Sequence, residues 1–349
     1  MRDKVRWGIA GAGTIANSFA SDFRFAPNAS LVAVASRKAA TADAFAERFG
    51  NVRSYPTLQA LAGADDIDAV YIASPNALHR EHAALFLAAG KAVLVEKPLT
   101  ATSADARALA TAAAASGRFA MEALWTCFLP ALSALRDMLR DGTIGAIRHV
   151  SAELAYEKPF DAGSRFFDPT LGGGSLLDLG VYPIALCLNL FGQPTSVDGT
   201  WKRAPSGVDN SAEIRLAYGG FDAVLACGFD RNGRNRFVIE GDRGTVAIDA
   251  PFLKASRLFL ATGGPARRLL QAKAREPLTD ALFKVARRMP LPGLKRFDHS
   301  FPGNGLQFEI GAASAAILEG RREHPLMPLE RSAAALDIVE AIRALPPTA

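Results

Sequence analysis

Hydrophobic residues follow two different patterns along this chain, and the change falls near residue 130. Before that point, short runs that are apolar at nearly every position alternate with longer segments in which apolar residues recur at helical spacing. Strands that are apolar throughout are typical of a parallel sheet buried on both faces. We therefore predict a parallel sheet with strands at residues 4–10, 31–35, 67–73, 93–95 and 119–124, joined by helices at 17–25, 41–49, 57–63, 81–89 and 104–116.

After Pro130, strand-like segments follow one another with turn signals between them rather than helices. Consecutive strands without crossover helices favour an antiparallel sheet. The strands are expected at residues 147–156, 197–202, 212–218, 223–229, 237–240, 246–249 and 257–261. Helices are expected at 131–140, after a glycine-rich turn within 171–191, at 306–318 and at 329–345, while 262–304 is predicted only as a long, partly helical excursion.

The composition restricts where this protein resides. Hydrophobic residues make up 49% of the 349 positions, enough for a large core, but no uninterrupted apolar run reaches about 18 residues. The first predicted strand begins close to the N-terminus and leaves no room for a signal peptide. Cys127, Cys187 and Cys227 match no metal-binding or redox spacing. We expect a soluble cytoplasmic protein with reduced cysteines and no membrane partner.

The formal net charge of +5 comes partly from one segment, residues 267–296, that is rich in arginine and lysine. Such a segment is most often a solvated loop or helix face, although it can also meet phosphates or an anionic surface. Aromatic residues do not alternate with the basic ones, as a platform for single-stranded nucleic acid would require. We expect no nucleic-acid partner.

A glycine-rich turn, Gly11 to Ala16, separates the first predicted strand from the first predicted helix. Small residues occupy the three positions of the dinucleotide fingerprint: Gly11 allows the tight turn, Gly13 lets the backbone approach a pyrophosphate, and Ala16 packs close to the strand. The amides of Thr14 and Ile15 at the helix start would face the phosphates. The predicted fold class is thus α/β, with a Rossmann dinucleotide-binding domain at residues 1–122 and an α+β domain at residues 123–349 that contains a large, mostly antiparallel open sheet.

The open face of that second sheet needs a cover, because a large apolar face exposed to water marks an interaction site. A second copy of the chain is the expected cover, which predicts a homodimer, or a dimer of dimers, through the C-terminal sheet.

The second predicted strand ends in Ser36-Arg37-Lys38, where an NAD-specific fold usually carries an acidic residue for the ribose 2′-hydroxyl. A hydroxyl and two cations suit a 2′-phosphate better. Charge-assisted hydrogen bonds contribute about 1.5 to 3 kcal/mol each, so Arg37 alone can set a preference of about ten- to a hundredfold for NADP over NAD. The alternative is an arginine solvated at a helix start, but the missing acid favours NADP as the cofactor.

A further strand end carries polar side chains at the same predicted sheet edge. Ser74, Pro75 and Asn76 follow the strand at residues 67–73, and His79 and His82 come soon after. The first three are candidates for packing against the cofactor. The two histidines lie three residues apart on a predicted helix, but no third or fourth ligand accompanies them, so we expect no metal site.

Lys97 lies at the carboxyl end of the strand that begins at Val93, between Glu96 and Pro98. Ligands of open α/β sheets bind at this edge, so a lysine there is a candidate for chemistry. A lone Lys-Pro is more often a surface turn, and the ligand signals at the neighbouring strand ends are what favour the chemical interpretation.

A second polar group of residues follows Gly172-Gly173-Gly174-Ser175 and contains Asp178 and Tyr182 in an otherwise apolar segment. If the chain is helical from Ser175 onwards, the carboxylate and the phenol are four residues apart and share one face. A cleft that holds Lys97 and a polyol substrate would supply the polar partners that they need in a buried helix. The structural alternative is an aspartate acting on the helix dipole beside a half-buried tyrosine.

Together these motifs resemble the glucose-fructose oxidoreductase/inositol dehydrogenase (Gfo/Idh/MocA) family over nearly the whole chain. The similar segments are residues 11–16, 74–76 with His79, 96–99 and 173–182. Residues 121–126, Arg165-Phe166, 305–309 and 325–329 are similar to the branch of dimeric dihydrodiol dehydrogenases and NADP-dependent D-xylose dehydrogenases. Cys127 departs from that branch, which often has arginine there, and the stretch 267–296 looks longer than in its members.

The resemblance implies that Lys97, Asp178 and Tyr182 form the catalytic set, although many relatives have a histidine where Tyr182 stands. It also implies a cis peptide before Pro98. The full set of expected cofactor contacts is Gly11, Gly13, Thr14, Ile15, Ser36, Arg37, Ser74, Pro75, Asn76, His79, Glu96, Lys97, Trp125 and Arg165.

We hypothesise that a substrate hydroxyl loses its proton to Tyr182 while its carbon gives a hydride to the nicotinamide. A free phenol titrates at about 10, so Lys97 is expected to lower the pKa of Tyr182, and Asp178 is expected to orient the substrate. The expected function is that of an NADP-dependent dehydrogenase of an aldose or cyclic trans-diol. Two alternatives stay open: a glycosidase that uses a tightly bound dinucleotide transiently, and a non-catalytic NADP-binding sensor or partner protein.

Overall fold

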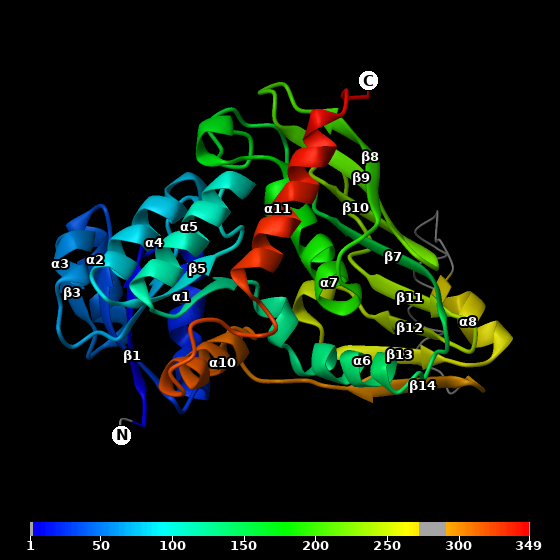
Figure 1. The fold of residues 1–349 in the computed structure, drawn as a ribbon, viewed down its shortest axis with the longest axis horizontal. Helices are drawn as coiled ribbons and strands as arrows, with labels where there is room; N and C mark the ends of the chain where they lie inside the picture. Colours follow the sequence, from blue (N-terminus) through cyan, green and yellow to red (C-terminus); the bar gives the residue numbers. More distant parts are fainter. Residues whose placement is uncertain (1–2, 272–290, 349) are drawn as a thin grey trace.

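The computed structural model describes residues 3–271 and 291–348. Two β-sheets lie side by side, one formed by the N-terminal third of the chain and the other by strands that follow residue 146 (Figure 1). Most of the basic segment predicted at 267–296 lies outside the described residues.

The first sheet has six parallel strands in the order β3-β2-β1-β4-β5-β6. Every residue of β4, β5 and β6 is buried, which is why these strands are apolar at nearly every position. The strand order reverses between β1 and β4, and this is the switch point at which such sheets bind ligands. The Rossmann prediction is confirmed, and the strand bounds are Val5–Ala10 for β1, Ala29–Ala35 for β2, Arg53–Tyr55 for β3, Ala69–Ile72 for β4, Ala92–Glu96 for β5 and Ala120–Ala123 for β6.

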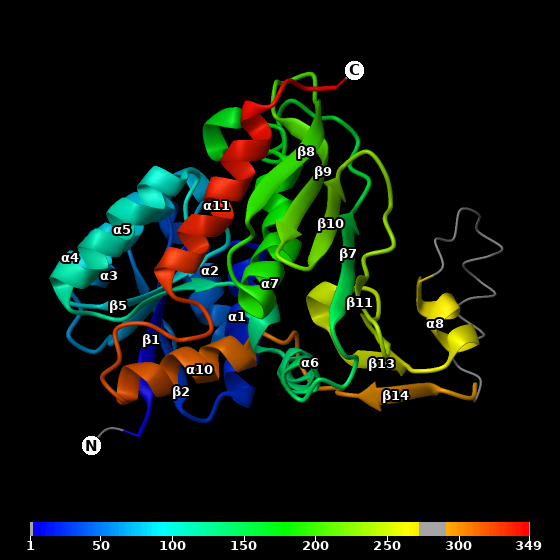
Figure 2. The same ribbon diagram turned by 45° about the vertical axis from the view of Figure 1, so that its right-hand side comes forward.

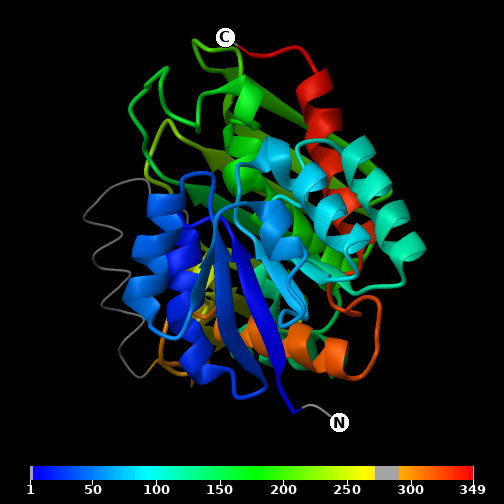
Figure 3. The same ribbon diagram turned by 90° about the vertical axis from the view of Figure 1, so that its left-hand side faces the viewer.

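Helices cover both faces of this sheet (Figure 3). In chain order they are α1 at Thr14–Asp22, α2 at Ala39–Phe49, α3 at Leu58–Ala62, α4 at His79–Ala88 and α5 at Ser103–Ser116. A C-terminal helix, α10 at Gln307–Leu318, also returns to the first sheet, where the indole of Trp7 donates to the hydroxyl of Ser314 at 3.0 Å. The N-terminal domain is therefore completed by residues from the far end of the chain.

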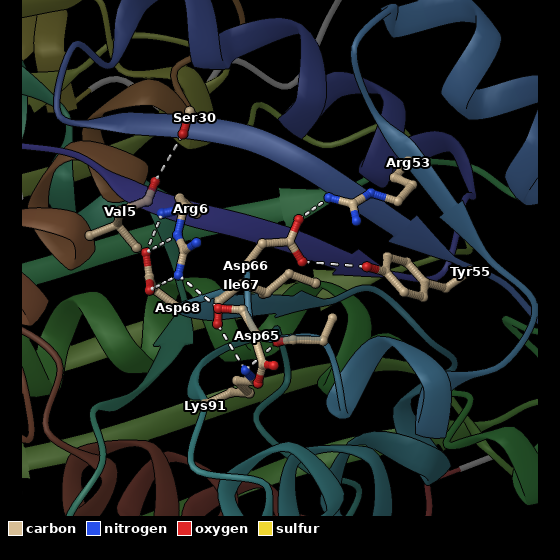
Figure 4. Close-up of polar contacts among 11 residues, drawn as sticks. Val5, Arg6, Ser30, Arg53, Tyr55, Asp65, Asp66, Ile67, Asp68 and Lys91 are labelled. Atoms are coloured by element: carbon tan, nitrogen blue, oxygen red, sulfur yellow. Dashed lines mark hydrogen bonds and ion pairs between the residues drawn. The ribbon is translucent and has the colours of Figure 1, made fainter.

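A network of polar contacts holds the turn before β4 in place (Figure 4). Arg6 donates from its main-chain N and its Nε to Asp68 Oδ2, at 2.9 and 3.0 Å. The ammonium of Lys91 donates to the carbonyls of Ala64 and Ile67, at 2.6 and 2.9 Å. Because these contacts join the starts of β1, β4 and β5, they align the opposite strand ends, where the predicted ligand residues lie.

The second sheet has eight strands in the order β14-β13-β12-β11-β7-β10-β9-β8. All neighbours are antiparallel except β7 and β10, so the predicted mostly antiparallel sheet is confirmed. The parallel pair is possible because a helix and a two-stranded hairpin separate β7 from β10 in sequence. The bounds are Ile147–Ala155 for β7, Ser196–Arg203 for β8, Asp209–Tyr218 for β9, Phe221–Gly228 for β10, Phe237–Gly241 for β11, Thr245–Ile248 for β12, Arg257–Ala261 for β13 and Leu294–Asp298 for β14.

The remaining helices are α6 at Pro130–Arg140, α7 at Val181–Phe191, α8 at Gly264–Gln271 and α11 at Leu329–Ala344. The segment Pro169–Phe191, which contains α7, is apolar and long enough to cross a membrane, yet 78% of its most apolar window is buried inside the protein. Figure 1 shows α7 between the second sheet and α11. We therefore describe it as the core helix of the second domain.

The outer face of the second sheet differs from the predicted apolar surface. Helix α8 covers Val238, Ala247 and Phe259 on β11 to β13, on the side of the sheet opposite α7 (Figure 2). On the uncovered strands, Arg215 of β9 faces Asp222 of β10 and donates to it at 3.0 Å. Within residues 3–271 and 291–348, the large hydrophobic side chains that are exposed are Ile15, Phe160 and Leu318, and none belongs to this sheet.

Candidate active site

Lys97 follows the last residue of β5, and its ammonium is already engaged across the domain boundary. Its Nζ donates to the main-chain oxygen of Asp178 at 2.7 Å and to the carboxylate Oδ1 of the same residue at 3.0 Å. Both side chains are only 15% exposed. The peptide bond between Lys97 and Pro98 is cis, as predicted from the resemblance. Lys97 thus brings the predicted sheet edge together with the second polar group of residues.

Asp178 and Tyr182 lie on two successive helical segments rather than on one regular helix. Asp178 belongs to a π-helical turn, η5 at Leu176–Gly180, and Tyr182 to the first turn of α7. The ring centre of Tyr182 lies 5.0 Å from Lys97 Nζ. The structure therefore brings the three predicted catalytic residues together.

The start of this helical segment is held by a buried carboxylate that the sequence analysis missed. Asp209, at the start of β9, accepts hydrogen bonds from the hydroxyl of Ser175 at 3.0 Å and from Nε of Arg343 at 2.6 Å. Gly174 has a φ of +113°, and a Cβ there would lie 2.4 Å from Asp209 Oδ1. The glycine in this turn is required because the anchoring carboxylate approaches so closely. No local sequence signal marks Asp209, whose partners lie 34 and 134 residues away.

Burial and Lys97 shift the pKa of Tyr182 in opposite directions. Burial raises it, Lys97 lowers it, and the balance raises the pKa of Tyr182 to about 12. Lys97 lowers the pKa of Tyr182, as expected, but the net pKa does not fall below that of a free phenol, because desolvation of the phenolate outweighs the attraction of one cation. The indole of Trp125 donates to the Tyr182 hydroxyl at 3.4 Å, which also favours the ionised form without reversing the balance.

The pKa values of the two carboxyl groups nearest Lys97 are shifted in opposite directions. Burial is the largest single influence and favours the neutral form of Asp178, but the charge and hydrogen bond of Lys97, with the charges of Arg165 and Lys158, together hold its pKa below the usual value. Burial raises the pKa of Glu96. For Lys97 itself, burial is outweighed by Asp178, Tyr182 and Glu96, which together raise its pKa above its ordinary value. Lys97 therefore stays an ammonium at neutral pH.

Glu96, a predicted cofactor contact, is held by two hydrogen bonds from its own domain. Its Oε1 accepts a hydrogen bond from Tyr71, and its Oε2 accepts one from the main-chain N of Lys97 at 3.0 Å. Both Glu96 and Tyr71 are buried. Tyr71 is a functional residue that sequence analysis missed, although a hydroxyl within the otherwise apolar strand β4 was a signal for it.

His79, another predicted cofactor contact, is held by main-chain oxygens. It is fully buried, and its Nδ1 and Nε2 each lie 2.8 Å from a main-chain oxygen, of Pro98 and Ser74 respectively. Burial lowers its pKa. Through these two contacts His79 joins the loops after β4 and β5, next to the predicted cofactor position. His82 contacts the Ser74 hydroxyl at 2.9 Å.

Asn76, in the loop after β4, lies at the interface between the two domains. The amide of Asn76 donates to the carbonyl of Gly172 at 3.3 Å, so this loop contacts the glycine turn that precedes Asp178. Across the described parts of the chain, no three His, Cys, Asp or Glu side chains gather as a metal site would need.

The glycine turn after β1 fits a dinucleotide. Gly11 has a φ of +108°, and a Cβ at this position would lie 2.7 Å from the carbonyl of Ala73, so only glycine allows β1 and β4 to end this close together. At Gly13 no atom lies within 4 Å of the Cβ position, which leaves the backbone open to a ligand. Helix α1 starts at Thr14 with no acidic residue in its first turn, and Ile15 is exposed. These features match an anion-binding helix start.

Ser36 and Arg37 follow β2 at the same edge of the sheet, and Arg37 is exposed. Among the residues that the structure describes, no carboxylate pairs with Arg37. The position is therefore available to a 2′-phosphate.

Trp125, Arg165 and Cys127 have distinct environments. Trp125 starts a short 3-10 helix, η3 at Trp125–Phe128, and contacts Tyr182 as described above. Arg165 stacks on the ring of Phe166, with its Cζ 4.2 Å from the ring centre. Cys127 is fully buried, and burial raises the pKa of its thiol to about 12, so it is a core residue. Neither of two surface cavities is lined by the three catalytic candidates: one of about 300 Å³ lies at the start of β1, and one of about 440 Å³ lies behind the glycine turn, where Gly173 and Asp209 line it.

Comparison with known proteins places this geometry in a family. Residues 5–124 match the model of GFO_IDH_MocA, an oxidoreductase family with an NAD-binding Rossmann fold, and residues 132–247 match the GFO/IDH/MocA C-terminal domain. Trans-1,2-dihydrobenzene-1,2-diol dehydrogenase from Bos taurus is 32% identical over 345 residues, which are 97% of this chain and 96% of that protein. The chain belongs to the GFO/IDH/MocA family.

Other members of the family are also similar. The scyllo-inositol 2-dehydrogenase (NADP(+)) IolU from Bacillus subtilis (strain 168) is 38% identical over 251 residues, which are 70% of this chain and 76% of that protein. The crystal structure of KijD10, a 3-ketoreductase from Actinomadura kijaniata in complex with NADP and TDP-benzene, matches with a TM-score of 0.78 and 26% identity over 97% of both chains. This GFO/IDH/MocA protein is an oxidoreductase with an NAD(P)-binding Rossmann domain, as its motifs predicted.

Proposed function

We propose that this oxidoreductase transfers a hydride between NADP and a sugar or cyclic trans-diol, with Tyr182 as the general acid/base and with Lys97 and Asp178 as its partners. The supporting observation is the meeting of the three side chains at the carboxyl end of β5, with Lys97 Nζ bonded to Asp178 and 5.0 Å from the Tyr182 ring. When bound, the nicotinamide supplies the hydride donor or acceptor and, when oxidised, a positive charge.

The protonation state of Tyr182 suits carbonyl reduction at neutral pH and hydroxyl oxidation at higher pH. With a pKa of about 12, Tyr182 keeps its proton at neutral pH and can give it to a carbonyl oxygen. In the oxidation direction the phenol must first lose that proton, so oxidation is favoured at higher pH. Lys97 stays charged, and its ammonium can stabilise the negative charge that develops on the substrate oxygen.

Asp178 can orient a substrate that has several hydroxyls. Lys97 occupies Oδ1, and no residue in the described part of the chain donates to Oδ2, which can accept a hydrogen bond from a substrate hydroxyl. The pKa of Asp178 lies below its usual value, so the carboxylate is ionised at neutral pH. An aldose or a trans-diol presents the neighbouring hydroxyl that this arrangement needs.

The cofactor would lie along the strand ends of the first sheet. Gly11, Gly13, Thr14 and Ile15 would hold the pyrophosphate, with Ser36 and Arg37 at the 2′-phosphate. Ser74, Pro75, Asn76 and Trp125 would pack against the nicotinamide end, with His79 and Glu96 behind them. The NADP named for the Bacillus subtilis relative, and the diol named for the Bos taurus relative, agree with this assignment.

The experiment that tests this function follows absorbance at the NADPH band with purified protein. NADP or NAD is supplied with a panel of pentoses, hexoses, inositols and aromatic trans-dihydrodiols, and Tyr182→Phe is assayed beside the wild type. Reduction of NADP by one polyol class, lost in the variant, is the expected result. Tight NADPH binding without turnover on this panel or on the matching ketones would overturn the assignment and favour the sensor.

We also propose that the protein is cytoplasmic and forms a homodimer, or a dimer of dimers, through the uncovered strands β7 to β10 of the second sheet. The support is that, among the helices that the structure describes, none packs on the outer face of these strands (Figure 2). Because that face is polar, the interface would rest on ion pairs and hydrogen bonds more than on apolar contact. Light scattering of the eluted protein at low and high salt tests the association.

A further inference from the structure

Two cationic side chains, those of Lys158 and Arg165, lie beside the candidate active site on one loop. Lys158 follows β7, and Arg165 lies seven residues later. The Lys158 Nζ lies 3.9 Å from the ring centre of Phe166, and the Arg165 Cζ lies 4.2 Å from the same centre. Lys158 also lies 5.5 Å from the ring centre of Phe229. Aromatic rings hold both cations in place, which reduces the entropy that they would lose on binding a ligand.

The ring that holds them is joined directly to the catalytic segment. The carbonyl of Phe166 accepts a hydrogen bond from Gly174 N at 2.9 Å, and the carbonyl of Gly174 accepts one from Asp178 N at 3.1 Å. The charges of Arg165 and Lys158 both act on the Asp178 carboxylate and help to lower its pKa. The two cations therefore lie within electrostatic reach of the substrate position.

Neither cation has a carboxylate partner in residues 3–271 and 291–348. The acids of the same loop have hydrogen-bond donors of their own: Glu157 accepts from Asn232 Nδ2 at 3.3 Å, Asp161 from Gly163 N at 2.9 Å, and Asp168 from Thr170 N at 2.8 Å. Asp178 is already paired with Lys97. This edge of the site thus carries two positive charges with which a bound anion can pair.

We propose that Lys158 and Arg165 form a subsite for an anionic group, a carboxylate or a phosphate, on the sugar or diol substrate. The inference rests on the proposed function and predicts that the enzyme prefers sugars or diols with an anionic group to neutral ones. In this proposal Arg165 binds the substrate, whereas the resemblance implied that it contacts the cofactor. The amides for the pyrophosphate lie after β1 in the first domain, whereas both cations come from the loop after β7, beside Asp178.

The test compares substrates that differ in charge. Initial rates of NADP reduction are measured with D-glucose, D-glucuronate and D-glucose 6-phosphate, which distinguish a neutral sugar, a carboxylate and a phosphate. We expect kcat/KM for one of the anions to exceed that for glucose by about tenfold or more, and to fall as salt screens the attraction. Arg165→Met and Lys158→Met should each lose about tenfold on the anion and little on glucose, with an unchanged Kd for NADPH.

Arg24→Met is the matched control, because Arg24 also stacks on a phenylalanine, with its Cζ 4.7 Å from the ring centre of Phe25, but lies in the 3-10 turn Phe23–Phe25 after the C-terminal end of α1. A second measurement does not need turnover: binding of the same three compounds to the enzyme with NADPH, followed by tryptophan fluorescence. Equal binding of the neutral and anionic sugars, or a weaker NADPH affinity in Arg165→Met, would overturn the subsite. Preferential binding of an anionic sugar without hydride transfer would instead overturn the proposed reaction and still support the anion subsite.

Discussion

Lys97 and Asp178 form a two-point contact: one ammonium donates to both the main-chain oxygen and the carboxylate of the same aspartate, at 2.7 and 3.0 Å. The contact joins the end of β5 in the first domain to the π-helical turn η5 in the second. Because the main-chain oxygen takes part, the position of the turn itself depends on Lys97, and not only the rotamer of Asp178. The catalytic candidates are therefore positioned by the docking of the two domains.

Removal of one hydroxyl tests the role of Tyr182. We expect Tyr182→Phe to lower kcat by about 10² to 10⁴, the usual contribution of a positioned acid or base, and to leave the Kd for NADPH unchanged. Tyr55→Phe is the matched control, because Tyr55 bonds Asp66 on the far edge of the first sheet. If Tyr182→Phe kept full turnover, Lys97 or Asp178 would be the group that transfers the proton.

The raised pKa of Tyr182 predicts a pH profile. With a pKa of about 12 in the free protein, the ionised fraction rises with pH throughout the accessible range. The rate of substrate oxidation under kcat/KM conditions should then increase about tenfold per pH unit between pH 7 and 9. The profile is measured by initial rates of NADP reduction in buffers of constant ionic strength. A plateau already present at pH 7 would contradict this assignment.

Arg37 is expected to set the cofactor preference. Replacement by alanine removes the cation that would face the 2′-phosphate, and should lower the preference for NADPH over NADH by about ten- to a hundredfold. Quenching of tryptophan fluorescence gives both dissociation constants for each variant. Lys202→Ala, an exposed cation on β8, is the control and should leave the ratio unchanged. A ratio that does not move in Arg37→Ala would place the 2′-phosphate elsewhere.

Glu309 predicts a pH-dependent stability. It is fully buried in α10, and neither carboxylate oxygen has a hydrogen-bond partner in the described residues. Burial, and then the carboxylates of Glu96, Asp22 and Glu122, raise its pKa well above the usual value. Since the folded protein holds this proton more tightly than the unfolded chain, Glu309 causes stability to fall as the pH rises above the ordinary carboxyl pKa.

Glu309→Gln should therefore be more stable than the wild type at pH 8 by about 1 to 3 kcal/mol, and no more stable at pH 4. Urea unfolding at both pH values, followed by circular dichroism, measures the difference. Glu47→Gln, an exposed position on α2, should show no such change. Equal stabilities of Glu309→Gln and the wild type at pH 8 would mean that a partner for the carboxyl forms in solution.

Local sequence patterns were sufficient for most of the fold. The buried strands of the first sheet are apolar at nearly every position, and the helix ends are marked by glycine, so periodicity and turn chemistry predicted them. Strand β3 was missed because it has only three residues, Arg53–Tyr55, with polar side chains. The parallel pairing of β7 with β10 was also missed, since strand direction depends on the path of the whole intervening chain.

The amino-acid sequence by itself determined the chemical groups of the site and their places at strand and helix ends: the glycine turn, Ser36 and Arg37, Lys97 after β5, and Asp178 with Tyr182. Only the tertiary structure decided their states. The pKa of Tyr182 depends on how much burial outweighs the charge of Lys97. The supports of the site, Tyr71 under Glu96 and Asp209 under the η5 turn, join residues from distant parts of the chain. The spacing of apolar residues predicts which face of an element is buried. Desolvation and the effect of charges distant in sequence depend instead on tertiary packing, which forms only when the two domains come together.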